Sequence, residues 1–365
     1  MPENSYNRTH SSILGVLSEI YRVKLQKPTK PNWQFDYRSF RRHNMILVYW
    51  LIFVNLIAFI LYGYDKSCAK KNKRRVPERT LLFWAWIGGS VGAFLGMRFF
   101  HHKTLKPKFF VVPVLMVLEI IICCVCLYQN YHLVTTDHEV DLGLSSEVTI
   151  VQISDLHNQF FGIKQKTLLK KIEAQKPDII VVTGDVVDKS HTNIDIAVDF
   201  FEGAVKIAPV YYITGNHELW LGSEKTAPLF EKMKSLGVIF MDDTYVDMGD
   251  YILAGIGDAS LDSFTAYGPF DDSKPVIMLA HEPQYNALYQ KLGADLVFTG
   301  HYHGGQIIIP GIGGFVSPEF EIFPKLYQGM TDMGGMQLVI SRGLGNSILP
   351  VRINNYPEIV VVKVR

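Results

Sequence analysis

The sequence predicts an α/β protein in which two sheets face each other with helices outside, preceded by an all-α membrane part of about three helices. Three observations support this. Val/Ile-rich runs at Val148–Ser154, Asp178–Thr183 and Val210–Thr214 alternate with helical patterns, as in a parallel sheet covered by helices. From Val238 onward, short strand-like segments are joined by turns rich in Gly, Pro and Asp. The first 130 residues contain three long apolar runs.

The elements of the C-terminal domain can be placed in order. Helices are expected near 164–175, 194–207 and 225–236. The polar stretch 129–147 is predicted to be a linker that includes a short edge strand around Glu139–Leu142, and the domain to run over 148–365. Later strands are expected at Val238–Met241, Tyr245–Val246, Tyr251–Ile256, Val276–Ala280, Ala294–Thr299, Gln306–Ile309, Met336–Ser341 and Glu358–Val364.

The apolar runs Met45–Tyr64, Leu81–Phe100 and Phe109–Tyr128 each have about the 20 residues needed to cross a bilayer. Buried core helices are the alternative, but three such runs with short basic connectors form a poor pattern for a soluble domain. We therefore predict a basic N-terminal tail over 1–43 and a transmembrane domain over 44–128. The chain is expected in the cell membrane as a multi-pass protein.

Charge is distributed unevenly along the chain. Residues 1–136 carry 19 Lys and Arg against 6 Asp and Glu, whereas residues 137–365 carry 17 against 29. The acidic balance of the second part argues against nucleic-acid binding. No Lys or Arg occurs in 129–148, so the positive-inside rule places the C-terminal domain outside the cytoplasm. Three simple crossings leave the basic connector 66–79 unexplained, and a re-entrant Leu81–Phe100 is the alternative.

Polar residues inside the apolar runs allow two interpretations. Glu119 lies near the middle of the third run, where an acid is costly and often functional. One interpretation is packing, with Glu119 bonded to Asn55 or Ser90 and a face of small residues at Gly88, Gly92 and Gly96. The other is a membrane transporter or sensor in which the C-terminal domain is regulatory.

Residues that commonly bind metals follow five of the expected strands. Ligands in open α/β sheets bind beyond the carboxyl ends of the strands, so these side chains are expected at one rim. Five strand ends that bring Asp, His and Asn to one rim form a metal site with too many ligands for one ion. Oxygen and imidazole donors without thiolate favour manganese, iron or zinc. The candidate residues are Asp155, His157, Asp185, Asn216, His217, His281, His301 and His303.

These blocks resemble the calcineurin-like metallophosphoesterase signature. They are Asp155-x-His157, Gly184-Asp185-x-x-Asp188, Gly215-Asn216-His217-Glu218, His281 and Gly300-His301-x-His303, and the resemblance covers about 137–365. The strings 300–306 and 341–345 are similar to a bacterial membrane-associated or exported branch. The resemblance implies a four-layer α/β/β/α sandwich and a metal-dependent hydrolase of phosphoester or phosphoanhydride bonds. The N-terminal half resembles a small membrane-domain family of unknown function, through Tyr64-Asp65-Lys66, Arg75–Glu78 and His102-Lys103.

The resemblance also implies a role for each residue. Asp155, His157 and His303 would hold one ion, and Asn216, His281 and His301 the second, with Asp185 shared between them. His217 matches the family's non-ligand histidine, a general acid to the leaving oxygen or an electrostatic partner of the phosphoryl group. Glu218 would orient the His217 ring.

Several further residues have two interpretations. Arg342 either contacts a substrate phosphate with two hydrogen bonds or pairs with an acid. Asp188 is expected to form a turn or cap a helix. Asp258 and Asn346 are weaker site candidates, and aromatic residues at 161 and 302 line either the pocket or the core.

We therefore expect a membrane-tethered, dinuclear-metal phosphohydrolase acting on a phosphorylated small molecule or lipid associated with the membrane or cell envelope. A metal-binding scaffold without catalysis is another alternative. The four cysteines show neither a disulfide framework nor zinc-type spacing. The sequence leaves the oligomeric state open.

Overall fold

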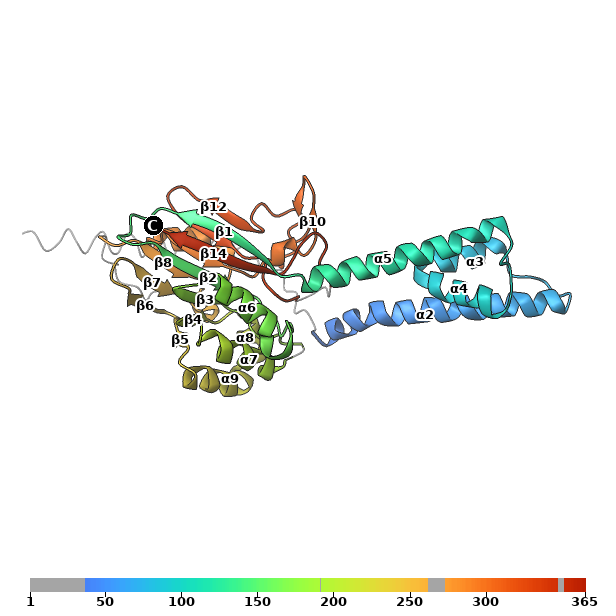
Figure 1. The fold of residues 1–365 in the computed structure, drawn as a ribbon, viewed down its shortest axis with the longest axis horizontal. Helices are drawn as coiled ribbons and strands as arrows, with labels where there is room; N and C mark the ends of the chain where they lie inside the picture. The colour runs from blue at the N-terminus through green and yellow to red at the C-terminus, as the bar shows by residue number, and fades with distance from the viewer. Residues whose placement is uncertain (1–36, 191, 262–272, 347–350) are drawn as a thin grey trace, which may run out of the picture. The chain divides into compact units, whose positions relative to one another are not determined.

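The structure is a computed structural model that describes residues 37–190, 192–261, 273–346 and 351–365. The expected tail over 1–43 lies outside these residues, apart from the beginning of the first helix. The C-terminal part contains two six-stranded sheets (Figure 1). The first has the order β1 (Val134–Val140), β14 (Glu358–Val364), β2 (Val148–Ile153), β3 (Ile179–Thr183), β4 (Val210–Ile213), β5 (Ile239–Phe240). The second has the order β12 (Gly329–Asp332), β13 (Gln337–Ile340), β9 (Leu296–Thr299), β8 (Val276–Leu279), β7 (Ile252–Gly255), β6 (Thr244–Asp247).

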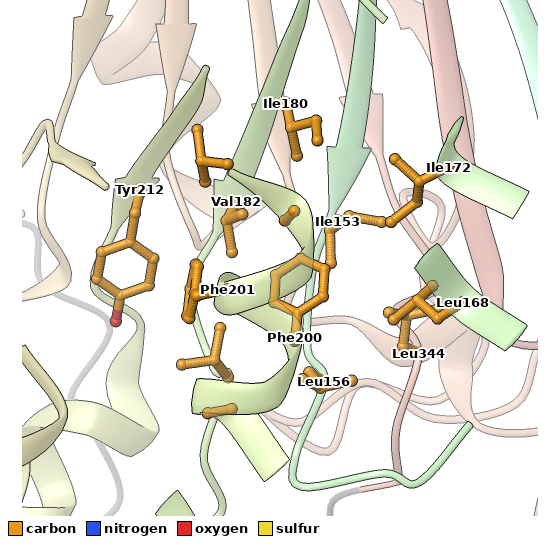
Figure 2. Packing of buried hydrophobic residues seen from close by; sticks show 14 of the residues in the cluster. Ile153, Leu156, Leu168, Ile172, Ile180, Val182, Phe200, Phe201, Tyr212 and Leu344 are labelled. Atoms are coloured by element: carbon orange, nitrogen blue, oxygen red, sulfur yellow. The ribbon is translucent and has the colours of Figure 1, made fainter. Parts of the chain in front are cut away.

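The apolar strands are buried on both faces, which explains their continuous Val/Ile runs. In β3, Ile180 and Val182 pack against α6 (Lys166–Ala174), α7 (Ile194–Ala204) and α9 (Ser223–Ser235), with Phe200 and Phe201 among the neighbours (Figure 2). The alternate residues Ile179 and Val181 face the second sheet. The outer face of that sheet packs against Tyr289 of α10 (Asn286–Lys291). The expected α/β/β/α layering is therefore confirmed.

Two short helices and an early strand differ from the sequence prediction. The stretch 129–147 is not a linker with a short strand, because β1 covers seven residues and pairs in parallel with β14. Its sequence is largely polar because it forms an edge of the sheet. The six-residue helices α8 (Asn216–Leu221) and α10 were not predicted, since fewer than two turns show no clear helical periodicity.

The N-terminal part contains three segments long and apolar enough to cross a membrane, Tyr49–Lys70, Glu78–Phe99 and Pro107–Tyr131. The first belongs to α2 (Tyr37–Lys70) and the third to α5 (Val111–Tyr131). The second is interrupted. It runs through α3 (Glu78–Trp84), a π-helical turn (Ala85–Gly89) and α4 (Ser90–Phe99), and Gly88 inside the turn has φ 106°. A positive φ of this kind is readily adopted by glycine and ends the straight helix.

This second segment is a hairpin that returns to the end from which it started. A straight helix of 22 residues would be about 33 Å long. Yet Glu78, at its beginning, lies 2.6 Å from Lys106 Nζ and 3.9 Å from Lys103 Nζ, just beyond its end. The geometry therefore differs from the expected simple crossing and matches the re-entrant alternative. Both basic connectors, 71–77 and 100–106, lie at the same end of α2.

Polar groups exposed by the helix break are satisfied within the protein. Asn55 donates from Nδ2 to the carbonyl of Gly88 at 2.8 Å, and its Oδ1 accepts from the backbone of Gly92 at 2.6 Å. Ser90 donates to the carboxylate of Glu119. Irregular backbone at membrane depth is tolerated only where its polar groups find such partners. These contacts favour the packing interpretation of Asn55, Ser90 and Glu119.

A buried carboxylate joins both connectors to α2. Asp65 lies 3.0 Å from Arg75, 2.7 Å from His102 and 2.9 Å from Lys103, and it accepts from the backbone of Val76 at 3.0 Å. All five residues belong to the short motifs through which the N-terminal half resembles a membrane-domain family. Their shared role here is to hold the ends of the hairpin together.

Candidate metal centre

The candidate ligands lie at one rim, where strands of both sheets end. Asp155 and His157 follow β2, Asp185 follows β3, and Asn216 and His217 begin α8 after β4. The second sheet contributes His281 after β8, and His301 and His303 after β9. All eight residues are buried. The structure thus brings together every residue of the predicted set.

The backbone at this rim is unusual. Five of the eight residues have positive φ: Asp155 (51°), His157 (44°), Asp185 (54°), His301 (65°) and His303 (48°). Such conformations cost of order 1–3 kcal/mol each and cluster at functional sites. Gly184 has φ 86°, and a Cβ at this position would lie 2.6 Å from the backbone nitrogen of Gly215. Glycine is therefore required for the two loops to approach each other.

A first group of donors contains Asp155, His157, His303 and Asp185. The Nε2 atoms of His157 and His303 are 3.2 Å apart. Asp155 Oδ1 lies 3.9 Å from His157 Nε2 and 3.6 Å from His303 Nε2, while Asp185 Oδ2 lies 3.6 Å from His157 Nε2. For metal–ligand distances near 2.1 Å, ligand atoms are about 3.0–3.4 Å apart in octahedral or tetrahedral sites. These groups fit one divalent ion after small adjustments.

The second group of donors tests more sharply whether the site can bind a metal ion, because its hydrogen bonds determine which ring nitrogens carry protons when the rings are neutral. His281 Nδ1 donates to the carbonyl of Thr183 at 2.7 Å, so Nε2 of the neutral ring is unprotonated. This Nε2 faces Asn216 Oδ1 at 2.9 Å and Asp185 Oδ2 at 3.3 Å. His301 Nε2 donates to Glu319 at 2.9 Å, leaving Nδ1 to face Asn216 Oδ1 at 3.0 Å. Burial acts to lower the pKa of each ring, but the neighbouring carboxylates, Asp185 for His281 and Glu319 for His301, raise it, so a proton competes for these nitrogens. With both rings neutral, four lone pairs would converge, and a metal cation would take the place of the ring protons.

Asp185 lies between the two groups. Its Oδ1 accepts from the backbone of His217 at 2.8 Å, which leaves Oδ2 directed at both His157 and His281. Burial acts to raise the pKa of Asp185, but the neighbouring His281 and His217 rings hold it well below its usual range. An ionised carboxylate in this position can be shared by two cations.

His217 lies beside the first group. Its Nδ1 accepts from the backbone of Lys189 at 3.3 Å, so the proton of the neutral ring is on Nε2. Burial lowers the pKa of His217 to about 4. Asp188 Oδ2 lies 3.4 Å from His217 Nδ1 and 3.6 Å from His157 Nδ1.

Two neighbouring acids differ from the sequence interpretation. Asp188 forms the expected turn by accepting from Ser190 at 2.7 Å, but the helix cap is Asn193, and its contact with two histidines was not foreseen. Glu218 was expected to orient His217. Instead it accepts from the backbone N–H groups of Asp185, Val187 and Gly215 at 2.8–3.2 Å, which holds the loop that carries Asp185.

The weaker candidates are mostly structural. Arg342 pairs with Glu358 at 2.7 Å, which is the acid-pair alternative. Phe161 and Tyr302 are core residues, and Asn346 accepts from Arg352 at 3.1 Å. Asp258 remains near the site: burial, and then Glu282, raise its pKa to about 7.

Two residues that support the site, Glu319 and Arg352, were not predicted because no local sequence pattern marks either of them. Glu319 comes from a loop 18 residues after the histidine it contacts. Arg352 is fully buried and donates to the carbonyl of Arg342 at 3.0 Å and to that of Gly345. Gly345 in turn donates to the carbonyl of Asp155 at 2.7 Å, so Arg352 supports the rim from behind.

Comparison with known proteins gives two family matches. Residues 148–305 match the calcineurin-like phosphoesterase family, and residues 55–109 match a protein family of unknown function, DUF1294. The chain is 30% identical over 224 residues to phosphodiesterase YaeI of Escherichia coli, covering 59% of this chain and 81% of that protein. It is 28% identical over 240 residues to an uncharacterized metallophosphoesterase of Campylobacter jejuni, covering 61% of this chain but only 60% of the relative.

A third relative extends the similarity toward the N-terminus. An uncharacterized metallophosphoesterase of Helicobacter pylori is 24% identical over 348 residues, covering 88% of this chain and 82% of that protein. A match of that length must include part of the N-terminal half. Together with the donor geometry, these matches show that the chain belongs to the calcineurin-like metallophosphoesterase family and carries its metal-dependent phosphoester hydrolase domain.

Proposed function

We propose that this protein is a membrane-tethered, dinuclear-metal phosphohydrolase that cleaves a phosphoester or pyrophosphate bond in a membrane- or envelope-associated substrate. The observation that supports it best is the pair of donor groups sharing Asp185, with lone pairs that face one another at about 3 Å. One ion is assigned to Asp155, His157 and His303, and the other to Asn216, His281 and His301. Manganese, iron and zinc all suit these donors.

In the proposed reaction, the ions supply Lewis acidity toward the phosphoryl oxygens and lower the pKa of water. The chain's own residues supply orientation and a proton. The neutral His217 ring presents Nε2–H toward the phosphoryl group and donates a hydrogen bond to it, whereas the alternative role of passing a proton to the leaving oxygen would require the imidazolium form. Glu218 and Arg352 are positioning residues, because they act through the backbone that carries the ligands.

We also propose that the catalytic domain lies outside the cytoplasm. With the second apolar segment folded as a hairpin, the connectors lie together at one end of α2. The stretches 66–79 and 98–108 contain seven and four Lys or Arg residues, against four in the 20 residues before Tyr49 and none in 129–148. The positive-inside rule then assigns both connectors to the cytoplasm and the catalytic domain to the opposite side. Protease cleavage of the catalytic domain in inverted vesicles, but not in right-side-out vesicles, would contradict this.

A panel of phosphate esters tests the activity. The full-length protein, loaded in turn with manganese, iron and zinc, is assayed with p-nitrophenyl phosphate, bis-p-nitrophenyl phosphate and an alkyl pyrophosphate. Hydrolysis of at least one ester that depends on the metal and is abolished by chelator supports the proposal. A preparation that holds two metal ions per chain and cleaves none of them supports the metal-binding scaffold instead.

Replacing His217 with Ala should reduce kcat by roughly 10²–10⁴-fold, because the Nε2–H donor is lost. Bound metal should remain near two ions per chain, since His217 is not among the assigned ligands. Steady-state kinetics and metal content by mass spectrometry check the two parts. Loss of a metal ion in this variant would assign His217 as a ligand.

Replacing Glu319 with Gln should weaken the second ion by about 10–100-fold, the usual effect of removing a carboxylate that orients a metal-binding histidine. The introduced amide can donate a hydrogen bond to His301 Nε2. The neutral ring is then no longer held with its proton on Nε2, the form in which Nδ1 is free to bind a metal ion. Metal titration of the full-length protein measures the affinity. Glu321→Gln, two residues along the same loop, is the matched control and should leave it unchanged.

A further inference from the structure

The end of α5 is bonded directly to the catalytic domain. Only two residues separate Tyr131, the last of α5, from Val134, the first of β1. Gln129 Oε1 accepts from the backbone of Asn354 at 2.9 Å, and Asn130 Oδ1 accepts from the backbone of Arg352 at 2.9 Å. Tyr residues at the end of a spanning helix mark the level of the membrane–water interface. Residues 352–354 therefore lie close to that level.

Two further hydrogen bonds connect residues 353–354 to a loop of the catalytic domain. The backbone nitrogen of Ile308 donates to the carbonyl of Ile353 at 2.9 Å, and Asn354 Nδ2 donates to the carbonyl of Ile308 at 3.3 Å. Ile308 begins the short hairpin of β10 (Ile308–Ile309) and β11 (Gly313–Gly314). The segment 307–323, named the interfacial loop below, thus starts beside the end of α5.

The interfacial loop exposes an unusual amount of apolar surface. The exposed fractions are 62% for Ile312, 65% for Ile322, 44% for Phe323, 40% for Phe315 and 64% for Phe320, and Ile353 next to the loop is 38% exposed. Single exposed apolar residues need no explanation, but a cluster within one loop marks an interaction surface. The same loop carries Glu319, which contacts His301. It therefore connects the end of the membrane helix with the metal centre.

We propose that the interfacial loop inserts its apolar side chains into the surface of the bilayer that holds α5, and that the substrate is a phosphorylated amphiphile presented from that bilayer. The substrate class rests on the phosphohydrolase function proposed above. The bilayer is the occupant because the loop is joined through Ile353 and Asn354 to the residues that end the spanning helix. Aromatic and aliphatic side chains beside a helix end are suited to the boundary between headgroups and acyl chains.

Loop insertion is tested without any assay of activity. Serine replaces the four native cysteines, and a nitroxide label is attached to Ile322→Cys in the full-length protein in phosphatidylcholine vesicles. We expect the label to be relaxed by oxygen and protected from a water-soluble nickel complex. The control is Ile239→Cys on β5, at the opposite edge of the first sheet from β1, which should be accessible to the nickel complex. Equal nickel accessibility at both positions would overturn the proposal.

Substrate class is tested with two esters that share one leaving group. Methyl p-nitrophenyl phosphate is soluble, and hexadecyl p-nitrophenyl phosphate is mixed into the vesicles. In each, water adds to phosphorus and the bond to p-nitrophenolate breaks. The double variant Ile322→Ser/Phe323→Ser should turn over the hexadecyl ester roughly tenfold more slowly, with the methyl ester unchanged, because less apolar surface holds the loop in the bilayer. Ile239→Ser should alter neither rate.

The remaining outcomes are distinct. Parallel loss on both esters would show a structural defect and overturn the substrate class, as would equal rates for the variant and the parent protein. A dimer in vesicles that dissociates in the double variant would assign the loop to a second copy of the chain. A parent protein that cleaves neither these diesters nor any compound of the ester panel counts against the proposed function, while the label still decides whether the loop is inserted.

Discussion

Replacing Asp185 with Asn should lower kcat/KM by about 10³-fold or more, because the negative charge between the two cations is lost. The amide still accepts from the backbone of His217 through Oδ1, so the loop should remain folded. Bound metal should fall below two ions per chain, since an amide attracts divalent cations less strongly than a carboxylate. Kinetics on the best ester of the panel and metal content by mass spectrometry measure both effects.

The matched control for this variant is Asp195→Asn. Asp195 is exposed in the first turn of α7, so the same chemical change there removes a charge without touching the rim. It should leave both metal content and activity unchanged. An Asp185→Asn protein that keeps two metal ions and normal turnover would exclude a shared ligand at this position.

Replacing Arg352 with Met should destabilise the catalytic domain by about 3 kcal/mol or more. The guanidinium is fully buried, and burial lowers its pKa to about 10, so it stays charged at neutral pH. Met fills similar space but leaves the carbonyls of Arg342 and Gly345 without their donor, and each unsatisfied buried group costs about 1–3 kcal/mol. The apparent Tm of the domain should fall by roughly 6–12 °C.

A matched control is Arg365→Met. Arg365 is half exposed and pairs with Glu147 at 2.7 Å on the surface, where water and salt screen the ion pair so that it contributes little to stability. The Tm of the Arg365→Met protein should therefore change much less than that of the Arg352→Met protein. An equal change in Tm for the two variants would show that the hydrogen bonds of Arg352 do not support the rim.

The sequence by itself determined the two-part architecture and the composition of the candidate site. Strands such as β3 are buried on both faces, so their apolar runs are visible in the sequence, and the ligand-type residues follow them directly. Because parallel strands present their carboxyl ends at one edge, Asp155, Asp185 and His281 could be expected together although they are far apart in the chain. Length and hydropathy likewise identified the three apolar segments.

Only the tertiary structure decided how those parts are connected. The hairpin at Gly88 depends on one backbone dihedral and on contacts between Glu78 and Lys106, and neither changes the hydropathy of the segment. Glu319 and Arg352 act through hydrogen bonds to residues brought near by folding, so no local pattern marks them. Periodicity reports which face of an element is buried, whereas the partner of a buried charge is set by the packing of distant segments.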